Sequence, residues 1–174
     1  MTISAPAQAL APSRSGDSVR AAMATGLGLG LLPVAPASWG TLLGVGIHAG
    51  LALTVPPSWR IGALLAALVA VCGLHYALTP WAQAYWRSTD PKRFVLDEVA
   101  GYLMVPILFP GGILWQVALW GFLVFRVLDV VKPPPARQID RNTKGATGIL
   151  LDDLVSGGYT ALVLYAGRWM GLLV

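Results

Sequence analysis

The most continuous apolar stretch of this chain runs from Ile61 to Trp86, and it limits the fold more than any other feature. A helix needs about 20 apolar residues to cross the hydrocarbon core of a bilayer, so this stretch is long enough to span a membrane. Composition agrees, because 56% of the residues are hydrophobic and 11% are charged, roughly half the charged fraction of a soluble domain. The sequence therefore predicts an all-α, polytopic membrane protein.

Three other apolar segments accompany this stretch. Thr41 to Val55 predicts a first, rather short membrane helix, and Ala146 to Leu173 predicts a last one. Between them, Val99 to Phe125 is interrupted at Pro106 and Pro110, and each half is too short to span a bilayer at about 1.5 Å per residue. We therefore expect two short helices in a hairpin that re-enters the membrane, or spans it with help from neighbouring residues. About three to five helices would then be membrane-embedded.

The chain divides into a polar start and one apolar domain. Residues 1–20 are rich in Ala, Pro and Ser and lack the apolar core of a secretory signal, which predicts a flexible tail. Residues 21–174 would form a single membrane-embedded catalytic domain. The one cysteine, Cys72, lies in an apolar run, so neither a disulfide within the chain nor a cysteine metal cluster is expected.

Basic residues are concentrated on one side of the predicted helices. The net charge is +4, but the basic residues lie in short loops between apolar stretches, so an anionic membrane surface or lipid explains them better than nucleic acid. If the tail is cytoplasmic, the opposite side receives Arg60 and Arg168. The cytoplasmic side receives Arg87, Lys92, Arg93, Arg126, Lys132, Arg137, Arg141 and Lys144. The positive-inside rule favours this orientation.

Acidic residues are concentrated as well, because seven of the eight lie between positions 90 and 153. Two adjacent pairs, Asp97-Glu98 and Asp152-Asp153, lie where polar segments enter apolar ones. Carboxylates at this depth are costly unless they are paired with a base or bound to a cation. Salt bridges to nearby bases are one interpretation. Adjacent like charges, with no base within a helical turn of Asp152, favour a hard divalent cation such as Mg²⁺.

Between the two pairs, Arg126, Asp129 and Lys132 repeat at every third position, which places them along one side of a helix end. The two bases could hold Asp129 in place, or they could bind a phosphate while Asp129 binds the metal. The prolines at 133–135 would stop the helix and keep Arg137 near the site. A metal ion with basic residues is suited to phosphoryl transfer. Because the sequence has no Cys-x5-Arg or Asp-x-Asp motif, we expect water attack assisted by one or two metal ions.

Three stretches carry a family resemblance: PASWGTLLG at 36–44, FVLDEVAGYLMVPILFP at 94–110, and FRVLDVVKPPPARQIDRNTKGATGILLDDLVSGGY at 125–159. In this order and spacing they resemble the phosphatidylglycerophosphatase A family. The resemblance implies Mg²⁺-dependent removal of the terminal phosphate from phosphatidylglycerophosphate, which gives phosphatidylglycerol and inorganic phosphate. It also implies a bacterial inner membrane, with the active site facing the cytoplasm. The implied site consists of Asp97, Glu98, Arg126, Asp129, Lys132, Asp152 and Asp153.

The first stretch departs from the family's usual Pro-Gly-Thr-x-Gly, because Ala37 and Ser38 replace Gly and Thr. A hydroxyl remains at Ser38, so a phosphate contact stays available there. Our hypothesis assigns three sets of roles. The Mg²⁺ ligands are Asp97, Glu98, Asp129, Asp152 and Asp153. The substrate-binding residues are Ser38, Arg126, Lys132 and Arg137. The catalytic residues are Asp97, Lys132, Asp152 and Asp153.

Two other functions fit parts of the pattern. A nucleotide-dependent phosphatidyltransferase also places Asp, Ala-Arg, Gly and paired Asp residues at a membrane face, but its motif fails at Val130 and Ser156. A non-catalytic membrane subunit or a cation transporter could use buried acids for assembly or ion passage. Transport acids should lie deep along a pathway, however, whereas these cluster at one face.

Overall fold

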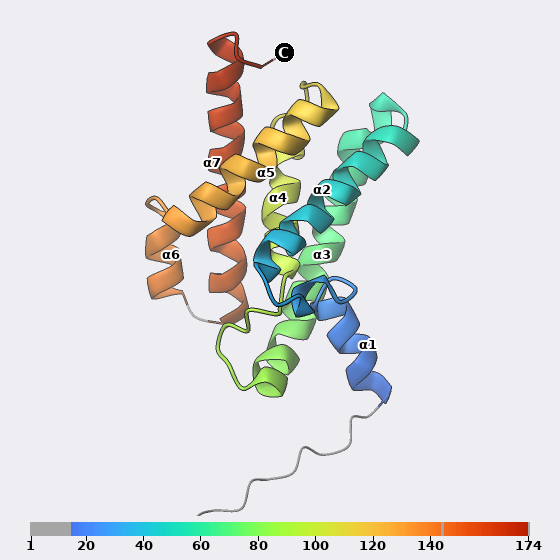
Figure 1. Cartoon of the computed structure of the whole chain (residues 1–174), viewed down its shortest axis with the longest axis vertical. Coiled ribbons are helices and arrows are strands. Elements are labelled where there is room, and N and C mark those ends of the chain that lie inside the picture. The colour runs from blue at the N-terminus through green and yellow to red at the C-terminus, as the bar shows by residue number, and fades with distance from the viewer. Residues whose placement is uncertain (1–14, 144, 174) are drawn as a thin grey trace, which may run out of the picture.

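The structure is a computed structural model, and it describes residues 15–143 and 145–173. Every regular element in that part of the chain is a helix, which confirms the predicted all-α class (Figure 1). In chain order the elements are α1 (Ser15–Ala24), η1 (Leu29–Leu31), α2 (Pro36–Thr54), α3 (Pro57–Trp86), α4 (Leu96–Leu108), α5 (Leu114–Val131), α6 (Ala136–Asn142) and α7 (Gly145–Trp169). Three of them, α3, α5 and α7, are long and apolar enough to cross a membrane. The chain is a helical membrane protein.

Helix α4 lies at the centre of the bundle, where it packs against α2, α3, α5 and α7 (Figure 1). Its residues Leu103 and Val105 are fully buried. Helices α2, α4 and α7 begin, and α3 and α5 end, at one end of the bundle, which we call the carboxylate end. We call the opposite end the remote end. This alternation brings five helix termini, from distant parts of the sequence, to the carboxylate end.

Helix α2 begins at Pro36, earlier than the predicted start at Thr41. Proline is favoured in the first turn of a helix, because its missing N–H would have no intrahelical partner there. The first motif is therefore helical, and its glycines lie against α4. A Cβ atom added to Gly40 would lie 2.6 Å from Cβ of Val95, so only glycine permits this close approach.

The predicted hairpin is present as α4, a turn at 109–113, and α5, and α5 follows the second alternative, because residues beyond Phe125 bring it to spanning length. Helix α5 continues past Phe125 to Val131. Within this extension Arg126 donates a 2.9 Å hydrogen bond to Asp129, and pairing at this spacing stabilises a helix that carries charge. At 18 residues α5 is a candidate span, whereas α4 has 13 residues.

The predicted flexible tail, residues 1–20, falls largely on residues 1–14, which lie outside the described residues. Residues 15–20 are helical and belong to α1, so the prediction does not hold for them. One contact that fixes α1 is the indole Nε1–H of Trp81, which donates to Asp17 at 3.0 Å. Ala24, at the end of α1, is buried against Leu78 and Phe94. Residues 15–20 therefore belong to the folded domain.

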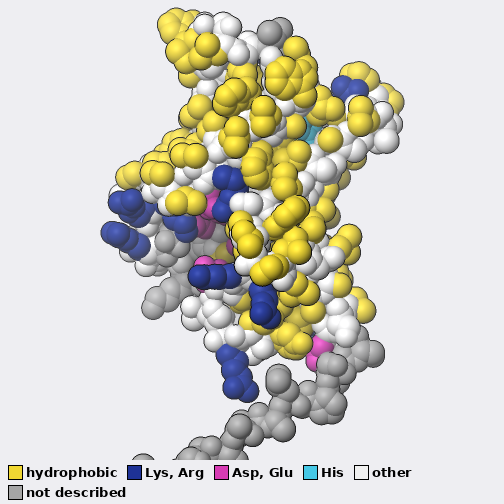
Figure 2. Space-filling view, viewed as in Figure 1, with side chains coloured by type: hydrophobic (Ala, Val, Ile, Leu, Met, Phe, Trp, Pro, Cys, Tyr) yellow, Lys and Arg dark blue, Asp and Glu magenta, His cyan; other side chains and the backbone are white. Residues whose placement is uncertain are grey.

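Charge separates the two ends of the bundle as predicted. Arg60 lies near the start of α3 and Arg168 near the end of α7, both at the remote end, whereas the other described basic residues lie at the carboxylate end. Lys144 lies outside the described residues. Between the ends the face shown in Figure 2 is mainly apolar, and Leu123 and Leu162 are among the exposed side chains in the middle of α5 and α7. Such a surface suits contact with lipid.

Candidate active site

The first turn of α4 places two adjacent carboxylates, Asp97 and Glu98, at the carboxylate end of the bundle. The preceding loop is anchored because Phe94 and Val95 are buried and the amide of Val95 donates to the Ala24 carbonyl at 3.1 Å. Asp97 is 7% exposed although it carries an ionisable group. The buried start of this central helix therefore fixes the direction of both acids.

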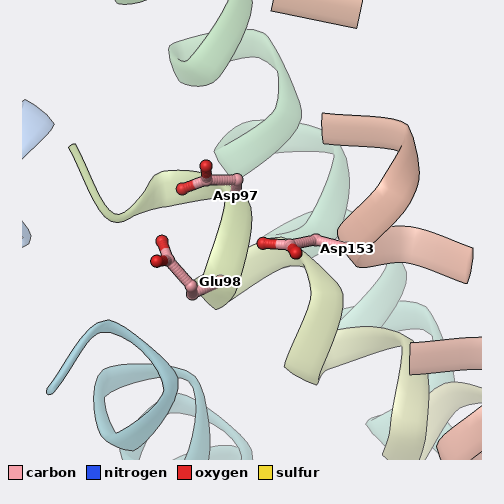
Figure 3. A group of neighbouring side chains, drawn as sticks. All are labelled: Asp97, Glu98 and Asp153. Atoms are coloured by element: carbon pink, nitrogen blue, oxygen red, sulfur yellow. The ribbon is translucent and has the colours of Figure 1, made fainter. Parts of the chain in front are cut away.

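A third carboxylate, Asp153, comes from α7 and meets the first two (Figure 3). One oxygen from each of Asp97, Glu98 and Asp153 lies within 4.8 Å of the others. We call these three residues the carboxylate triad. Mg²⁺ is bound in proteins by oxygen ligands of this kind, so the three carboxylates form a candidate metal site. The structure thus brings together three of the five acids that the sequence predicted as metal ligands.

Glycines hold α7 close enough to α4 to form the triad. A Cβ atom on Gly157 of α7 would clash with the backbone carbonyl of Gly101 in α4. A Cβ atom on Gly101 would lie 2.7 Å from the Phe125 ring and 2.9 Å from the Asp153 carbonyl. Close packing of this kind is typical of helices in membranes. It positions Asp153 beside the first turn of α4.

The triad concentrates negative charge where little water can reach it. Burial, followed by the charge of Glu98, raises the pKa of Asp97 well above its usual range. Burial also raises the pKa of Glu98 to about 8, and the nearby charges of Asp153 and Asp129 add to this effect. Among the described residues, neither Oδ1 of Asp97 nor Oε2 of Glu98 has a hydrogen-bond partner. The triad therefore needs either protons or a cation.

The other two predicted ligands, Asp129 and Asp152, have basic partners instead. Asp129 accepts the 2.9 Å hydrogen bond from Arg126 within α5. The Lys132 ammonium donates to Asp152, which is 5% exposed. No base lies within a helical turn of Asp152 in the sequence, but Lys132 reaches it from the end of α5, so the salt-bridge interpretation applies to Asp152. Lys132 follows α5 in a left-handed conformation, with φ of 48°, and reaches α7 from there.

A cavity of about 360 Å³ opens beside these groups. The whole triad lines it, together with Asp129, Lys132 and Asp152. Lys92 also lines the cavity, although it was not predicted as a site residue. It lies two positions before the second motif, which could have drawn attention to it. Figure 2 shows further Lys and Arg side chains around the acidic group.

Three of the predicted substrate-binding residues do not line this cavity among the described residues: Ser38, Arg126 and Arg137. Ser38 is in the first turn of α2, next to Pro36 and Ala37, which do line it. Arg137 is exposed and donates to the Val131 carbonyl at 3.2 Å. Arg126 is held by Asp129. Of the predicted phosphate-binding residues, Lys132 is therefore the one placed at the cavity itself.

The arrangement combines a cluster of buried oxygen ligands with ammonium groups at its edge. Such a combination can hold a cation and an anionic group side by side, which is the requirement for neutralising a phosphate during its transfer. It lies at the end of a membrane bundle, where the head group of a lipid is found.

Comparison with known proteins agrees with this chemistry. The family model for phosphatidylglycerophosphatase A matches residues 22–168. Phosphatidylglycerophosphatase A of Escherichia coli is 33% identical over 143 residues, which cover 82% of this chain and 80% of that protein. The Haemophilus influenzae protein of the same name is 32% identical over 149 residues, covering 85% and 88%.

A Bacteroides thetaiotaomicron protein, named as a candidate phosphatidylinositol-3-phosphatase, is 32% identical over 151 residues, which cover 84% of this chain and 91% of that protein. No solved structure gives a significant match to this chain. The matched region includes every residue of the triad as well as Lys132 and Asp152. The chain belongs to the phosphatidylglycerophosphatase A family.

Proposed function

We propose that this protein is a lipid phosphatase, which hydrolyses the terminal phosphate monoester of phosphatidylglycerophosphate and releases phosphatidylglycerol and inorganic phosphate. The observation that carries the proposal is the convergence of three carboxylates from α4 and α7 beside Lys132, in a chain of this family. The phosphatidyltransferase alternative is not favoured, because the family that matches is a phosphatase family.

The proposed cofactor is Mg²⁺, held by Asp97, Glu98 and Asp153. The donor set fits, because it consists of carboxylate oxygens and Mg²⁺ prefers oxygen ligands. The unpartnered oxygens of Asp97 and Glu98 also fit, since a cation would satisfy both of them. When bound, Mg²⁺ would neutralise charge on the phosphate oxygens and lower the pKa of a water molecule.

The proposed task of Lys132 is to bind the phosphate at the cavity. Asp152 keeps the ammonium group in position through their ion pair, because its carboxylate is buried on α7. Lys92 provides a second positive charge at the cavity edge. In the same way Asp129 holds Arg126, whose charge remains close enough to attract the anionic head group. Contacts of Ser38 and Arg137 with the phosphate remain predictions from the sequence.

The depth of the site suits a lipid substrate that stays in the membrane. Asp153 and the exposed Trp169 lie on the same helix, α7, and helical rise separates them by about 24 Å along its axis. If Trp169 marks one interface, the triad lies near the opposite edge of a hydrocarbon core about 30 Å thick. The acyl chains would remain in the bilayer while the head group reaches the cavity.

The proposed location is the inner membrane of a bacterium, with the carboxylate end facing the cytoplasm. The Escherichia coli and Haemophilus influenzae relatives are bacterial. The excess of arginine and lysine at the carboxylate end supports this orientation through the positive-inside rule.

The test is phosphate release by the purified protein in detergent micelles that contain phosphatidylglycerophosphate. A parallel assay uses phosphatidylinositol-3-phosphate, the substrate class in the name of one relative. We expect faster release from phosphatidylglycerophosphate. Faster release from phosphatidylinositol-3-phosphate would assign the chain a different substrate, and no release from either lipid by folded protein would refute the phosphatase proposal.

A further inference from the structure

A second cavity lies at the remote end of the bundle. Its volume is about 460 Å³, and it is lined by the remote parts of α2, α3 and α5 together with the α4–α5 turn. Much of its wall is apolar, with Leu64, Phe109 and Val117 among the lining residues. Within the described part of the chain, the two cavities share no lining residue. The remote cavity is therefore separate from the carboxylate triad.

Two lining residues offer hydrogen-bond donors to this cavity. Arg60 is half-buried and uses Nε–H to donate to the Val55 carbonyl at 3.0 Å, while its two Nη groups bond to no described residue. His48 is 8% exposed, and its Nδ1 lies 3.3 Å from the Tyr102 hydroxyl. In the tautomer in which Tyr102 donates to Nδ1, the Nε2–H of His48 is a further donor.

No described residue supplies an acceptor for the free Nη groups of Arg60. Every described acidic residue lies at the carboxylate end, so Arg60 has no carboxylate partner among them. The other arginine of the remote end, Arg168, already has partners within the chain. It donates to the Gly111 carbonyl at 2.6 Å and lies 5.8 Å from the Phe109 ring. A half-buried guanidinium beside apolar walls is costly without a counter-charge.

We propose that the remote cavity binds the phosphodiester head group of an anionic phospholipid in the leaflet opposite the carboxylate end. The planar guanidinium of Arg60 suits a phosphate, because its two Nη groups can donate to two oxygens at once. His48 donates to the head group from the other wall, and the apolar lining contacts the first part of the acyl chains. A zwitterionic lipid would bring its own cation towards Arg60, so the cavity favours an anionic lipid.

Native mass spectrometry of the detergent-solubilised protein tests this inference. The probes are phosphatidylglycerol and phosphatidylcholine with identical acyl chains. We expect the wild-type protein to bind phosphatidylglycerol more tightly, and Arg60→Gln to weaken that binding by about tenfold, the effect of losing one charge-assisted contact. Arg168→Gln removes the same charge from the same end outside the proposed contact, so it should leave binding unchanged.

A second measurement locates the lipid. A phosphatidylglycerol with a photoreactive head group should crosslink to residues 55–61 or 109–114, and this labelling should disappear in Arg60→Gln. Phosphate release by Arg60→Gln should equal that of the wild type, which shows that the variant is folded. Equal binding of both lipids, equal loss in Arg60→Gln and Arg168→Gln, or labelling confined to the carboxylate end would overturn the proposal.

Discussion

Asp152 and Asp153 are neighbours in the sequence, yet α7 turns them toward different partners. Asp153 joins Asp97 and Glu98 in the triad, whereas Asp152 pairs with Lys132. Both side chains are buried, at 5% and 4% exposure. One acid therefore adds to a repulsion that a cation would relieve, and the other has its charge balanced by the chain. Replacing them should have opposite effects on stability.

The first prediction concerns the triad. Asp97→Asn and Glu98→Gln should each lower phosphate release by on the order of 100-fold, the scale of losing a metal ligand. In a chelating buffer the same variants should unfold at a temperature equal to or above that of the wild type, because each removes one of three mutually repelling charges. Phosphate assays and thermal unfolding in detergent measure the two effects.

Asp17→Asn is the matched control for these variants. It also removes a carboxylate from the carboxylate end, but its amide oxygen can still accept the hydrogen bond from Trp81. Activity near that of the wild type is expected. A comparable loss in Asp17→Asn would mean that total charge at this end, rather than the triad, controls the reaction.

The second prediction concerns the pair between Lys132 and Asp152. Lys132→Met should lower the free energy of unfolding by about 1–3 kcal/mol, because it leaves a buried carboxylate without its base. The double variant Lys132→Met with Asp152→Leu should recover most of this stability, since neither charge remains. It should nevertheless stay inactive, because the cavity has lost its ammonium group. Recovery of phosphate release in the double variant would exclude Lys132 from phosphate binding.

At the scale of the helices, the contact between α4 and α7 sets the geometry of the site. Gly157 faces Gly101 directly, whereas a Cβ atom on the neighbouring Gly158 would meet only Leu108, at 4.0 Å. The two glycines are adjacent on the same helix and differ in the space around them. Replacing each of them with alanine therefore separates the effect of helix propensity, which both substitutions share, from the effect of close packing, which only Gly157 experiences.

The third prediction uses this pair. Gly157→Ala should destabilise the protein by about 1–3 kcal/mol, because the added methyl group forces α7 away from α4, and activity should fall as Asp153 moves. Gly158→Ala should be neutral or stabilising by up to about 1 kcal/mol, because alanine is the better helix former. Unfolding temperatures and phosphate release of the two variants provide the comparison. Equal tolerance of both substitutions would contradict the close contact.

Much of the helical arrangement could be predicted from the sequence, because apolar stretches and prolines mark the helices directly. The prolines at 133–135 correctly marked the end of α5, but its length was not predicted, because the apolar run was taken to end at Phe125 and the Arg126–Asp129 pair lies inside the helix. The start of α2 was missed as well, because the helix was predicted from Thr41 and Pro36 was not considered as a residue of its first turn. Length and hydropathy do not describe such local pairing and capping.

The sequence predicted which residues gather at the site, but not which acids form the triad and which pair with basic residues. The positions of the five acids between apolar stretches predicted that they lie at one end of the bundle. The structure places the triad at that end, together with Lys132. The partner of Asp152 was missed because Lys132 lies 20 positions away in the sequence, and only the folded chain brings the two side chains together. Among the described residues, Ser38 and Arg137 do not line the cavity. Membership of a motif does not determine which side chains face a cavity, because that depends on how the surrounding side chains pack.

At the scale of the whole molecule, the two ends of the bundle differ in charge. Acids and most bases meet at the carboxylate end, whereas the remote end carries Arg60 and Arg168 among the described residues. A bundle with this asymmetry should insert with one orientation. The carboxylate end would then face the side on which phosphate is released.

The fourth prediction is that orientation. In a Cys72→Ala background, Thr89→Cys places an exposed thiol at the carboxylate end and Ser58→Cys places one at the remote end. A membrane-impermeant maleimide should label Ser58→Cys in cells with a permeabilised outer membrane. It should label Thr89→Cys only after the inner membrane is opened. The reverse pattern would place the carboxylate end outside the cytoplasm.

The most direct test of the account is a Mg²⁺ titration that follows activity and stability in the same samples. Purified wild-type protein and Asp153→Asn are freed of divalent cations, and phosphate release from phosphatidylglycerophosphate and the unfolding temperature are measured as Mg²⁺ is added. We predict that both quantities rise over the same Mg²⁺ range in the wild type, and that neither responds in Asp153→Asn. Full phosphate release by the metal-free wild type, or an unchanged response in Asp153→Asn, would contradict a Mg²⁺ site at the triad.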